Sequence, residues 1–272
     1  MGKPIFNDEL WKLIEAILPP AKPRRFKYPR RKLVPDRAAL TGIPFALKTG
    51  IRWHNLPAKM GCGSGMSCWQ RFRDWLQAGA WETLHSLRLA ILRAANQIDF
   101  SRVAVDSLSI RAIGAGGKPN SNPSDRARPG SKSHIATDAH GTPIVAILTG
   151  ANRNDVTQLI PLIESIAPIK GVRDRPLSNP KRIYGDRGYD HDKYRRILHE
   201  RGIPTSIAKR EKLHGNGLGK IRWIVERTRA WLHHVRRLRI RFERRADIHE
   251  ALLKLGCYLI CRNTLQRTQQ SL

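Results

Sequence analysis

The chain has 272 residues, 40% of them hydrophobic, so it is long enough to bury a core and too apolar to be disordered throughout. Its 50 Lys and Arg outnumber its 22 Asp and Glu, which leaves a formal net charge of +28. A folded chain this basic repels itself unless a polyanion binds it, which indicates a nucleic-acid partner. A membrane-surface protein is disfavoured, because the basic residues run along the whole chain and form no single amphipathic segment.

The lengths of the apolar runs and the spacing of the cysteines indicate the cellular compartment of the protein and the state of its thiols. No stretch approaches the roughly 18 apolar residues of a membrane span, and the opening residues do not have the pattern of a signal peptide. We therefore expect an intracellular protein without a membrane segment and with reduced thiols. The cysteine spacings differ from those of zinc sites, which disfavours metal binding by Cys62, Cys68, Cys257 and Cys261.

The beginning of the chain predicts helices separated by a basic segment. Asn7 or Asp8 can cap a first helix that ends before Pro19, and Asp36 is predicted to cap a second helix that covers residues 37–48 and ends at Gly50. Between them lies the basic, proline-marked segment 22–32. A run of this kind is either a solvated tether or a segment that lies on phosphates.

Two further helices are predicted over residues 68–77, with Ser67 as the cap, and over residues 81–96. Two helices joined by a tight turn are typical of helix-turn-helix readers of DNA. Plain helical packing gives the same pattern, and the sequence leaves both interpretations open. We predict an N-terminal helical, DNA-binding region over residues 1–97.

From residue 98 onward, short strand-like runs alternate with amphipathic helices. This pattern predicts an α/β domain over residues 98–272, with a mixed sheet flanked by helices in the element order of the ribonuclease-H-like fold. The segments 114–131 and 209–220 are too polar to pack, and we expect them to be mobile without DNA. The predicted strands cover residues 102–110, 134–138, 143–148, 182–186 and 204–208, and the predicted helices cover residues 155–166, 190–201, 221–236 and 247–263.

Three acidic residues stand out by their positions. Asp106 lies inside an otherwise apolar strand, where a lone carboxylate is costly unless it is paired or binds a metal. Asp186 lies at the carboxyl end of a strand, where open α/β sheets place ligands. Glu226 is a rare acid in a very basic helix. Two strand aspartates and a glutamate from a helix packed on them can form one carboxylate cluster.

The helix that carries Glu226 has two stripes. The apolar stripe faces the core, and a neighbouring polar stripe has positions three and four residues apart, at Arg222, Glu226, Arg229 and His233. Taken alone, this polar stripe is explained by surface salt bridges, each contributing about 0.3–0.5 kcal/mol. The strand aspartates favour a different interpretation, because three neighbouring carboxylates stay ionised when divalent cations lie among them.

Such a cluster predicts a site for two metal ions, Mg²⁺ or Mn²⁺, with Asp106, Asp186 and Glu226 as ligands. Two such ions activate a water or a 3′-hydroxyl for attack on a phosphodiester. Arg222, Arg229 and His233 are then candidates for phosphate contacts, and so is Arg187, which follows Asp186. Earlier in the chain, Lys132 belongs to a basic turn and His134 follows it. Both are candidate DNA contacts, although His134 also fits a polar strand edge.

At this point the sequence resembles the insertion-sequence transposases of the IS-five family, a family of Asp-Asp-Glu (DDE) transposases, over nearly its whole length. The acidic motifs that carry the resemblance are Val105-Asp106-Ser107, Gly185-Asp186-Arg187-Gly188-Tyr189-Asp190 and Arg222-Trp223-Ile224-Val225-Glu226-Arg227-Thr228. The N-terminal and middle blocks that resemble the family include Lys48-Thr49-Gly50-Ile51-Arg52-Trp53, Pro129-Gly130-Ser131-Lys132-Ser133-His134 and Leu148-Thr149-Gly150-Ala151-Asn152-Arg153-Asn154-Asp155.

The resemblance implies a transposase that binds the ends of its insertion element, cleaves DNA strands there and transfers them into target DNA. It also implies a homodimer or higher oligomer on DNA, in the bacterial cytoplasm and associated with the nucleoid. Two positions depart from related families. Gly219 stands where those families have a tyrosine, and His233 stands where they have a lysine. The acidic triad is intact.

Other functions share parts of this pattern. A nuclease or junction resolvase of the same fold hydrolyses DNA without joining it, and the residues alone do not separate the two. A non-catalytic DNA-binding protein is favoured where one of the three acids is missing, and here all three are present. A ribosomal-type RNA binder accounts for the charge but not for the placement of the carboxylates.

Overall fold

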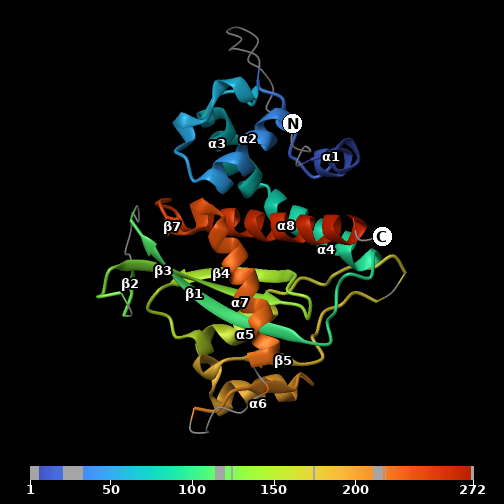
Figure 1. Cartoon of the computed structure of the whole chain (residues 1–272), viewed down its shortest axis with the longest axis vertical. Helices are drawn as coiled ribbons and strands as arrows, with labels where there is room; N and C mark the ends of the chain where they lie inside the picture. The colour runs from blue at the N-terminus through green and yellow to red at the C-terminus, as the bar shows by residue number, and fades with distance from the viewer. Residues whose placement is uncertain are drawn as a thin grey trace.

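The computed structural model describes residues 6–20, 33–113, 120–123, 125–173, 175–210, 217 and 219–270. Within these residues, strands form one mixed sheet, and helices pack on both of its faces (Figure 1). The α-helices are α1 (Asp8–Glu15), α2 (Asp36–Thr49), α3 (Gly65–Gln77), α4 (Ala80–Ala94), α5 (Leu159–Glu164), α6 (Asp192–Glu200), α7 (Gly219–His234) and α8 (Ala246–Gln270). The strands are β1 (Val103–Ala112), β2 (Asn120–Ser121), β3 (Pro129–Thr137), β4 (Pro143–Gly150), β5 (Ile183–Gly185), β6 (Thr205–Ile207) and β7 (Ile240–Arg241).

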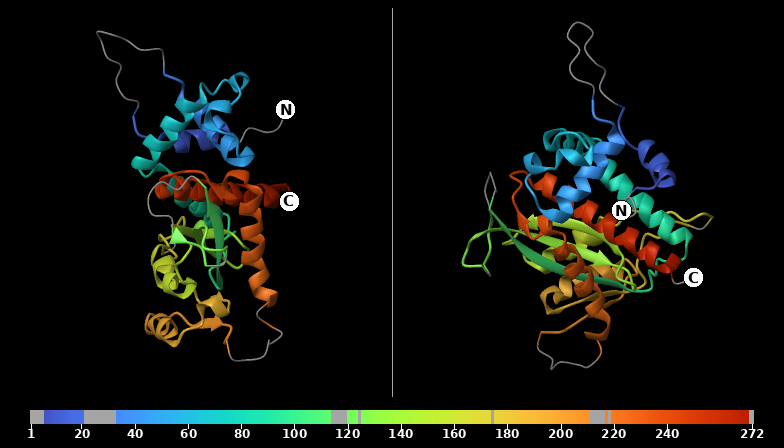
Figure 2. Two further views of the ribbon diagram at one scale, coloured as in Figure 1. Left: turned by 90° about the vertical axis from the view of Figure 1, so that its left-hand side faces the viewer. Right: turned by 45° about the horizontal axis from the view of Figure 1, so that its top comes forward.

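The sheet has the order β4-β3-β1-β5-β6 along its main path, with the short β2 and β7 paired to β3 and β1. β1, β3 and β4 are antiparallel neighbours, whereas β5 and β6 run parallel to β1. Figure 2 shows α5 and α7 on opposite sides of this sheet. The architecture confirms the predicted ribonuclease-H-like class, with a mixed sheet flanked by helices.

The helix ends in the N-terminal region confirm most of the predicted signals. The Asn7 side chain accepts a hydrogen bond from the Leu10 N–H, and α2 ends at Gly50, whose φ of 70° is a left-handed conformation that suits glycine. The predicted caps Asp36 and Ser67 are wrong. Asp36 is the first residue of α2, and no described side chain caps the start of that helix. α3 begins earlier, and Ser64 caps it by accepting from the Ser67 N–H. The basic segment 22–32 lies outside the described residues.

The second helix of the helix-turn-helix pattern is packed within the protein. α4 lies along α8 and buries one face, including Trp81. Its exposed side carries Glu82, Thr83 and Ser86, and Glu82 forms an ion pair with Lys254 of α8. This arrangement is what plain helical packing predicts, and it offers no basic face on α4 for reading DNA.

The polar segment predicted over residues 114–131 is partly ordered structure. β3 already begins at Pro129, and Gly130 and Ser131 are buried in the sheet. The prediction failed because the hydrogen bonds of a strand need no apolar side chains, and glycine lets strands approach closely. A β-carbon at Gly130 would lie 2.9 Å from the Ala151 β-carbon. Residues 114–119 and 124 of this segment, and residues 211–216 and 218 of the second polar segment, lie outside the described residues.

Two predicted helices differ in length from those observed. The segment predicted as one helix over residues 155–166 is a 3₁₀ turn at Asp155–Gln158 followed by the short α5, and α8 extends to Gln270. No helix within the described ranges is both long enough and apolar enough to cross a membrane.

The buried apolar side chains form two clusters. One joins α1–α4 to α7 and α8 and reaches the sheet at Ile135 and Ala146. The other contains residues of the sheet and of α5 and α6, and it also includes Leu89 and Leu92 of α4 and Cys261 of α8. The boundary that we predicted between residues 97 and 98 stays a prediction, and the first cluster contains residues from both sides of it. The four cysteines are buried and free.

Candidate active site

Asp106 lies in the middle of β1, and its side chain is almost completely buried. One carboxylate oxygen, Oδ1, accepts a hydrogen bond of 2.8 Å from the Ser107 N–H. The other, Oδ2, is enclosed without a hydrogen bond, although Nη1 of Arg229 lies 3.0 Å away as an ion pair. Burial raises the pKa of the Asp106 carboxyl above its ordinary value, and the charge of Arg229 opposes this shift.

Asp186 lies beside Asp106 because of the strand register. β1 and β5 are parallel, and Ala104 pairs with Tyr184, so each aspartate follows two residues after this pair. Asp186 ends β5 and caps the short 3₁₀ turn Arg187–Tyr189, because its Oδ1 accepts a hydrogen bond of 2.8 Å from the Gly188 N–H.

A side chain at Gly188 would crowd the Asp186 carboxylate. A β-carbon there would lie 2.8 Å from Asp186 Oδ1 and 3.6 Å from Asp155 Oδ2. The absence of a side chain at Gly188 therefore lets the Asp186 carboxylate fold back onto the turn.

Glu226 reaches the same region from α7. Its side chain is about half exposed, and Oε1 lies 3.3 Å from Nη2 of Arg222, one turn earlier on the helix. The same Arg222 nitrogen lies 3.8 Å from Asp186 Oδ2. Arg222 therefore connects Asp186 to Glu226, and Arg229 contacts Asp106. The structure thus brings these two arginines of α7 against all three predicted acids.

The chemistry of these side chains fits a hard divalent cation. All three acids offer carboxylate oxygens, which Mg²⁺ and Mn²⁺ prefer, and Asp106 Oδ2 is a buried oxygen without a hydrogen bond. Among the described residues, no three His, Cys, Asp or Glu side chains already gather closely enough to hold a metal ion. The arginines lie among the carboxylates instead, so metal binding requires them to move.

His233 and Arg187 were also predicted to contact phosphate. His233 follows Arg229 by one turn of α7, and its Nε2 is buried without a hydrogen bond. Burial, and then the charge of Arg229, lower the pKa of His233, so the ring is neutral at pH 7 and offers a hydrogen bond and no charge. Arg187 directly follows Asp186, and its carbonyl accepts a hydrogen bond from the Arg210 side chain.

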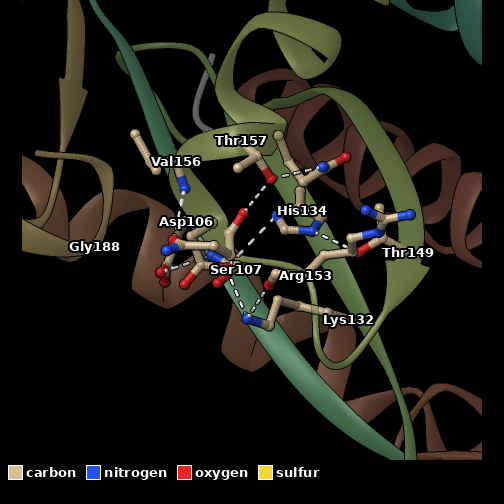
Figure 3. Close-up of polar contacts among 12 residues, drawn as sticks. Asp106, Ser107, Lys132, His134, Thr149, Arg153, Val156, Thr157 and Gly188 are labelled. Carbon is tan, nitrogen blue, oxygen red and sulfur yellow. Dashed lines mark hydrogen bonds and ion pairs between the residues drawn. The ribbon is translucent and has the colours of Figure 1, made fainter. Parts of the chain in front are cut away.

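The other predicted DNA contacts, Lys132 and His134, lie on the opposite face of the sheet. Asp106 pairs with Ile135, whereas His134 pairs with Ser107, and successive residues of a strand face opposite sides. His134 is fully buried, with Nε2 2.9 Å from the Thr149 hydroxyl (Figure 3), so its ring has no exposed surface for a DNA contact.

Lys132 donates a hydrogen bond of 2.9 Å to the Arg153 carbonyl and lies 3.0 Å from Oδ1 of Asp155. Asp155 is a residue that the sequence reasoning missed, because it was assigned only the start of a helix. Asp155 lies in the block 148–155, which resembles a middle block of the family's sequences. This position was the available signal that Asp155 has a further role.

Comparisons with known proteins agree with this arrangement. Residues 98–263 match the family model "Transposase DDE domain", and residues 6–85 match the model "Putative transposase of IS4/5 family". The chain is 68% identical over 155 residues to the "Putative transposase for insertion sequence element IS402" of Burkholderia cepacia, covering 57% of this chain and 74% of that relative. It is 67% identical over 123 residues to the "Insertion element IS402 uncharacterized 16.2 kDa protein" of the same organism, covering 45% of this chain and 84% of that relative. The chain belongs to the DDE transposases of the IS4/5 family, which are enzymes of the polynucleotidyl transferase kind.

Proposed function

We propose that this transposase binds the ends of its own insertion element, cleaves DNA strands there in a metal-dependent reaction, and joins the released ends to target DNA. The observation that carries the proposal is the convergence of Asp106, Asp186 and Glu226, from β1, the end of β5 and α7, on Arg222 and Arg229. Family membership supports DNA as the partner.

In this proposal Asp106, Asp186 and Glu226 hold two divalent ions, Mg²⁺ or Mn²⁺. The chemistry that such ions supply is activation of a water or a 3′-hydroxyl and stabilisation of the leaving oxygen. Arg222 and Arg229, which lie on the carboxylates in the DNA-free chain, turn towards phosphates when DNA and metal bind. The neutral ring of His233, on the same helix face, offers a hydrogen bond to phosphate. Arg187 contributes a positive charge beside Asp186.

A plasmid assay tests this function. The purified chain is incubated with supercoiled DNA that carries the ends of its element, with Mg²⁺ or with EDTA. We expect Mg²⁺-dependent nicks at the ends and joined products. Nicks without joined products would instead indicate a nuclease, and tight binding without any cleavage would indicate a DNA-binding protein that does not catalyse.

Substitutions of the acids test the site itself. We expect Asp106→Asn, Asp186→Asn and Glu226→Gln each to reduce cleavage by at least ~10³-fold, because each removes charge from the metal site. Binding to the element ends is expected to remain. Glu164→Gln is a matched control, because Glu164 lies on α5 in an exposed ion pair with Arg201. Normal cleavage by any of the three acid variants overturns the assignment of that residue.

DNA binding and assembly need separate measurements. Each phosphate that the basic chain neutralises contributes about −0.9 to the slope of log affinity against log salt concentration, so we expect a steep slope. The N-terminal region, residues 1–97, is proposed to contribute to this binding. Because both element ends are held together during transposition, we also propose a dimer or higher oligomer on DNA. The mass of the complex with a DNA end tests this stoichiometry.

A further inference from the structure

Lys132 and Asp155 form a polar connection between β3 and the segment that follows β4. Lys132 Nζ lies 3.0 Å from Asp155 Oδ1 and donates to the Arg153 carbonyl at 2.9 Å, so its ammonium contacts two groups of the same segment (Figure 3). His134, two residues along β3, places its Nδ1 3.9 Å from the same Asp155 oxygen. The side chains of Lys132 and Asp155 are only 14% and 26% exposed, so the pair is largely removed from solvent.

Asp155 also lies against the loop that carries Asp186. The 3₁₀ turn that begins at Asp155 packs on the 3₁₀ turn that follows Asp186. At Gly188, between the two acids, an added β-carbon would contact both the Asp155 and the Asp186 carboxylates. Tyr189 on this loop is buried, and the charges of Asp155, Asp106 and Asp186 add to the effect of burial in raising its pKa. Asp155 therefore belongs to the electrostatic surroundings of the two strand aspartates.

We propose that Lys132 and Asp155 are a positioning pair that holds the Asp186 loop in its metal-binding place, and that Lys132 acts on this loop and not on DNA. The inference deepens the proposed function and rests on it. Lys132 anchors Asp155 to β3, the strand next to the one that carries Asp106, and Asp155 supports the turn on which Asp186 lies.

The pair also compensates a negative charge close to Asp186. An unneutralised carboxylate at Asp155, close to Asp186, would add like charge to the site and would be poorly solvated. Lys132 compensates that charge. When one member of a buried ion pair is removed, the other is left uncompensated, which costs more than removing both. The two substitutions are therefore expected to be non-additive.

The experiment is a double-mutant cycle with Lys132→Met, Asp155→Asn and the double variant in the full chain. The first readout is Mn²⁺ affinity of the DNA-free protein, followed by the loss of the electron paramagnetic resonance signal of free Mn²⁺. The second is the salt dependence of DNA affinity in EDTA. Arg201→Met and Glu164→Gln, which break an exposed ion pair, are the matched controls.

We expect each single variant to weaken Mn²⁺ binding about 10-fold, because loss of a group that orients a metal ligand has an effect of this size in other metal sites. The double variant should bind Mn²⁺ more tightly than either single variant and more weakly than the wild type. The slope of DNA affinity against salt should not change. If a single variant does not fold, the double variant still tests the proposal. It must bind Mn²⁺ more weakly than the wild type and keep the wild-type slope of DNA affinity against salt.

Two results would overturn the positioning role. One is unchanged Mn²⁺ affinity, or additive losses, across the cycle. The other is a slope that becomes shallower by about 0.9 in Lys132→Met, which is the signature of one lost phosphate contact. Failure of the proposed function is a separate outcome, in which the wild type gives no Mg²⁺-dependent nicks in the plasmid assay. The Mn²⁺ titration and the salt dependence of DNA affinity still test the role of Lys132 and Asp155 in that case. A wild type that binds no Mn²⁺, either alone or with element-end DNA, overturns both.

Discussion

Arg229 of α7 lies 3.0 Å from Asp106 of β1, opposite a carboxylate oxygen that is buried and accepts no hydrogen bond. Arg222 lies 3.8 Å from the more exposed Asp186 carboxylate and donates a hydrogen bond of 3.3 Å to Glu226. A guanidinium and a divalent ion compete for the same carboxylate oxygens. In the DNA-free chain the arginines therefore hold the acids together and oppose metal entry, and phosphate groups of DNA offer these arginines another partner.

The first prediction concerns this competition. Arg229→Gln should raise the Mn²⁺ affinity of the DNA-free protein several-fold, which corresponds to about 1 kcal/mol of lost repulsion at an incompletely buried site. The same variant should cleave element-end DNA more slowly, because a phosphate contact is lost. Both are measured at pH 8, because burial raises the pKa of the Asp106 carboxyl and a higher pH favours its ionised form. Unchanged or weaker Mn²⁺ binding would contradict the competition.

A second prediction follows from the crowding at Gly188. In Gly188→Ala the new β-carbon would lie 2.8 Å from Asp186 Oδ1, which is too close, so the carboxylate must turn away from its place. We expect cleavage to fall by at least ~10-fold, since a small displacement at a reacting centre has effects of this size. The melting temperature should change little. Gly217→Ala is the matched control, because a β-carbon there meets nothing within 4 Å. Equal cleavage by the two variants would show that the Asp186 geometry tolerates the change.

The sequence was sufficient to predict Asp106, Asp186 and Glu226 as a group because each has a local signal: an acid in an apolar strand, an acid at a strand end and an acid in a basic helix. The role of Asp155 had no such signal. Its partner Lys132 lies 23 residues earlier, and they meet because β3 and β4 pair in one particular register. The burial of His134 could not be predicted from the local sequence pattern either. Which face of a strand is covered depends on the helices that pack there.

A third prediction concerns a buried cluster of charged side chains outside the candidate active site. Glu243 accepts from Arg237 at 2.8 Å and contacts His249 at 3.3 Å, and all three side chains are buried. Burial opposes ionisation, but the hydrogen bond with His249 and the charge of Arg237 keep the pKa of Glu243 below its ordinary 4.5. The stability from this ionised carboxylate is therefore complete above pH 4.5 and is lost as the pH falls through the lowered pKa.

Glu243→Gln should thus lower the free energy of unfolding at pH 7 by about 3–5 kcal/mol, since it breaks a buried pair. The difference from the wild type should shrink as the pH falls below 4.5. Urea unfolding at a series of pH values measures it, with Glu164→Gln as the exposed control. A difference that stays constant down to pH 3 would mean that the carboxylate charge is not what stabilises the cluster.

The last prediction concerns cooperativity across the predicted boundary at residue 97. Arg237, from the segment after α7, donates a hydrogen bond to the Ile51 carbonyl and lies over the Trp53 ring at 4.8 Å. α4 packs along α8, and one apolar cluster contains residues from the N-terminal helices and from the end of the chain. Because exposing either part would expose this shared core, we expect the full chain to unfold in a single thermal transition with equal calorimetric and van't Hoff enthalpies. Arg237→Met should lower the transition temperature without splitting it, since the apolar contacts remain. Two resolved transitions in the wild type would instead mean that residues 1–97 form a separately stable domain and that the shared core contributes little to holding the two parts together.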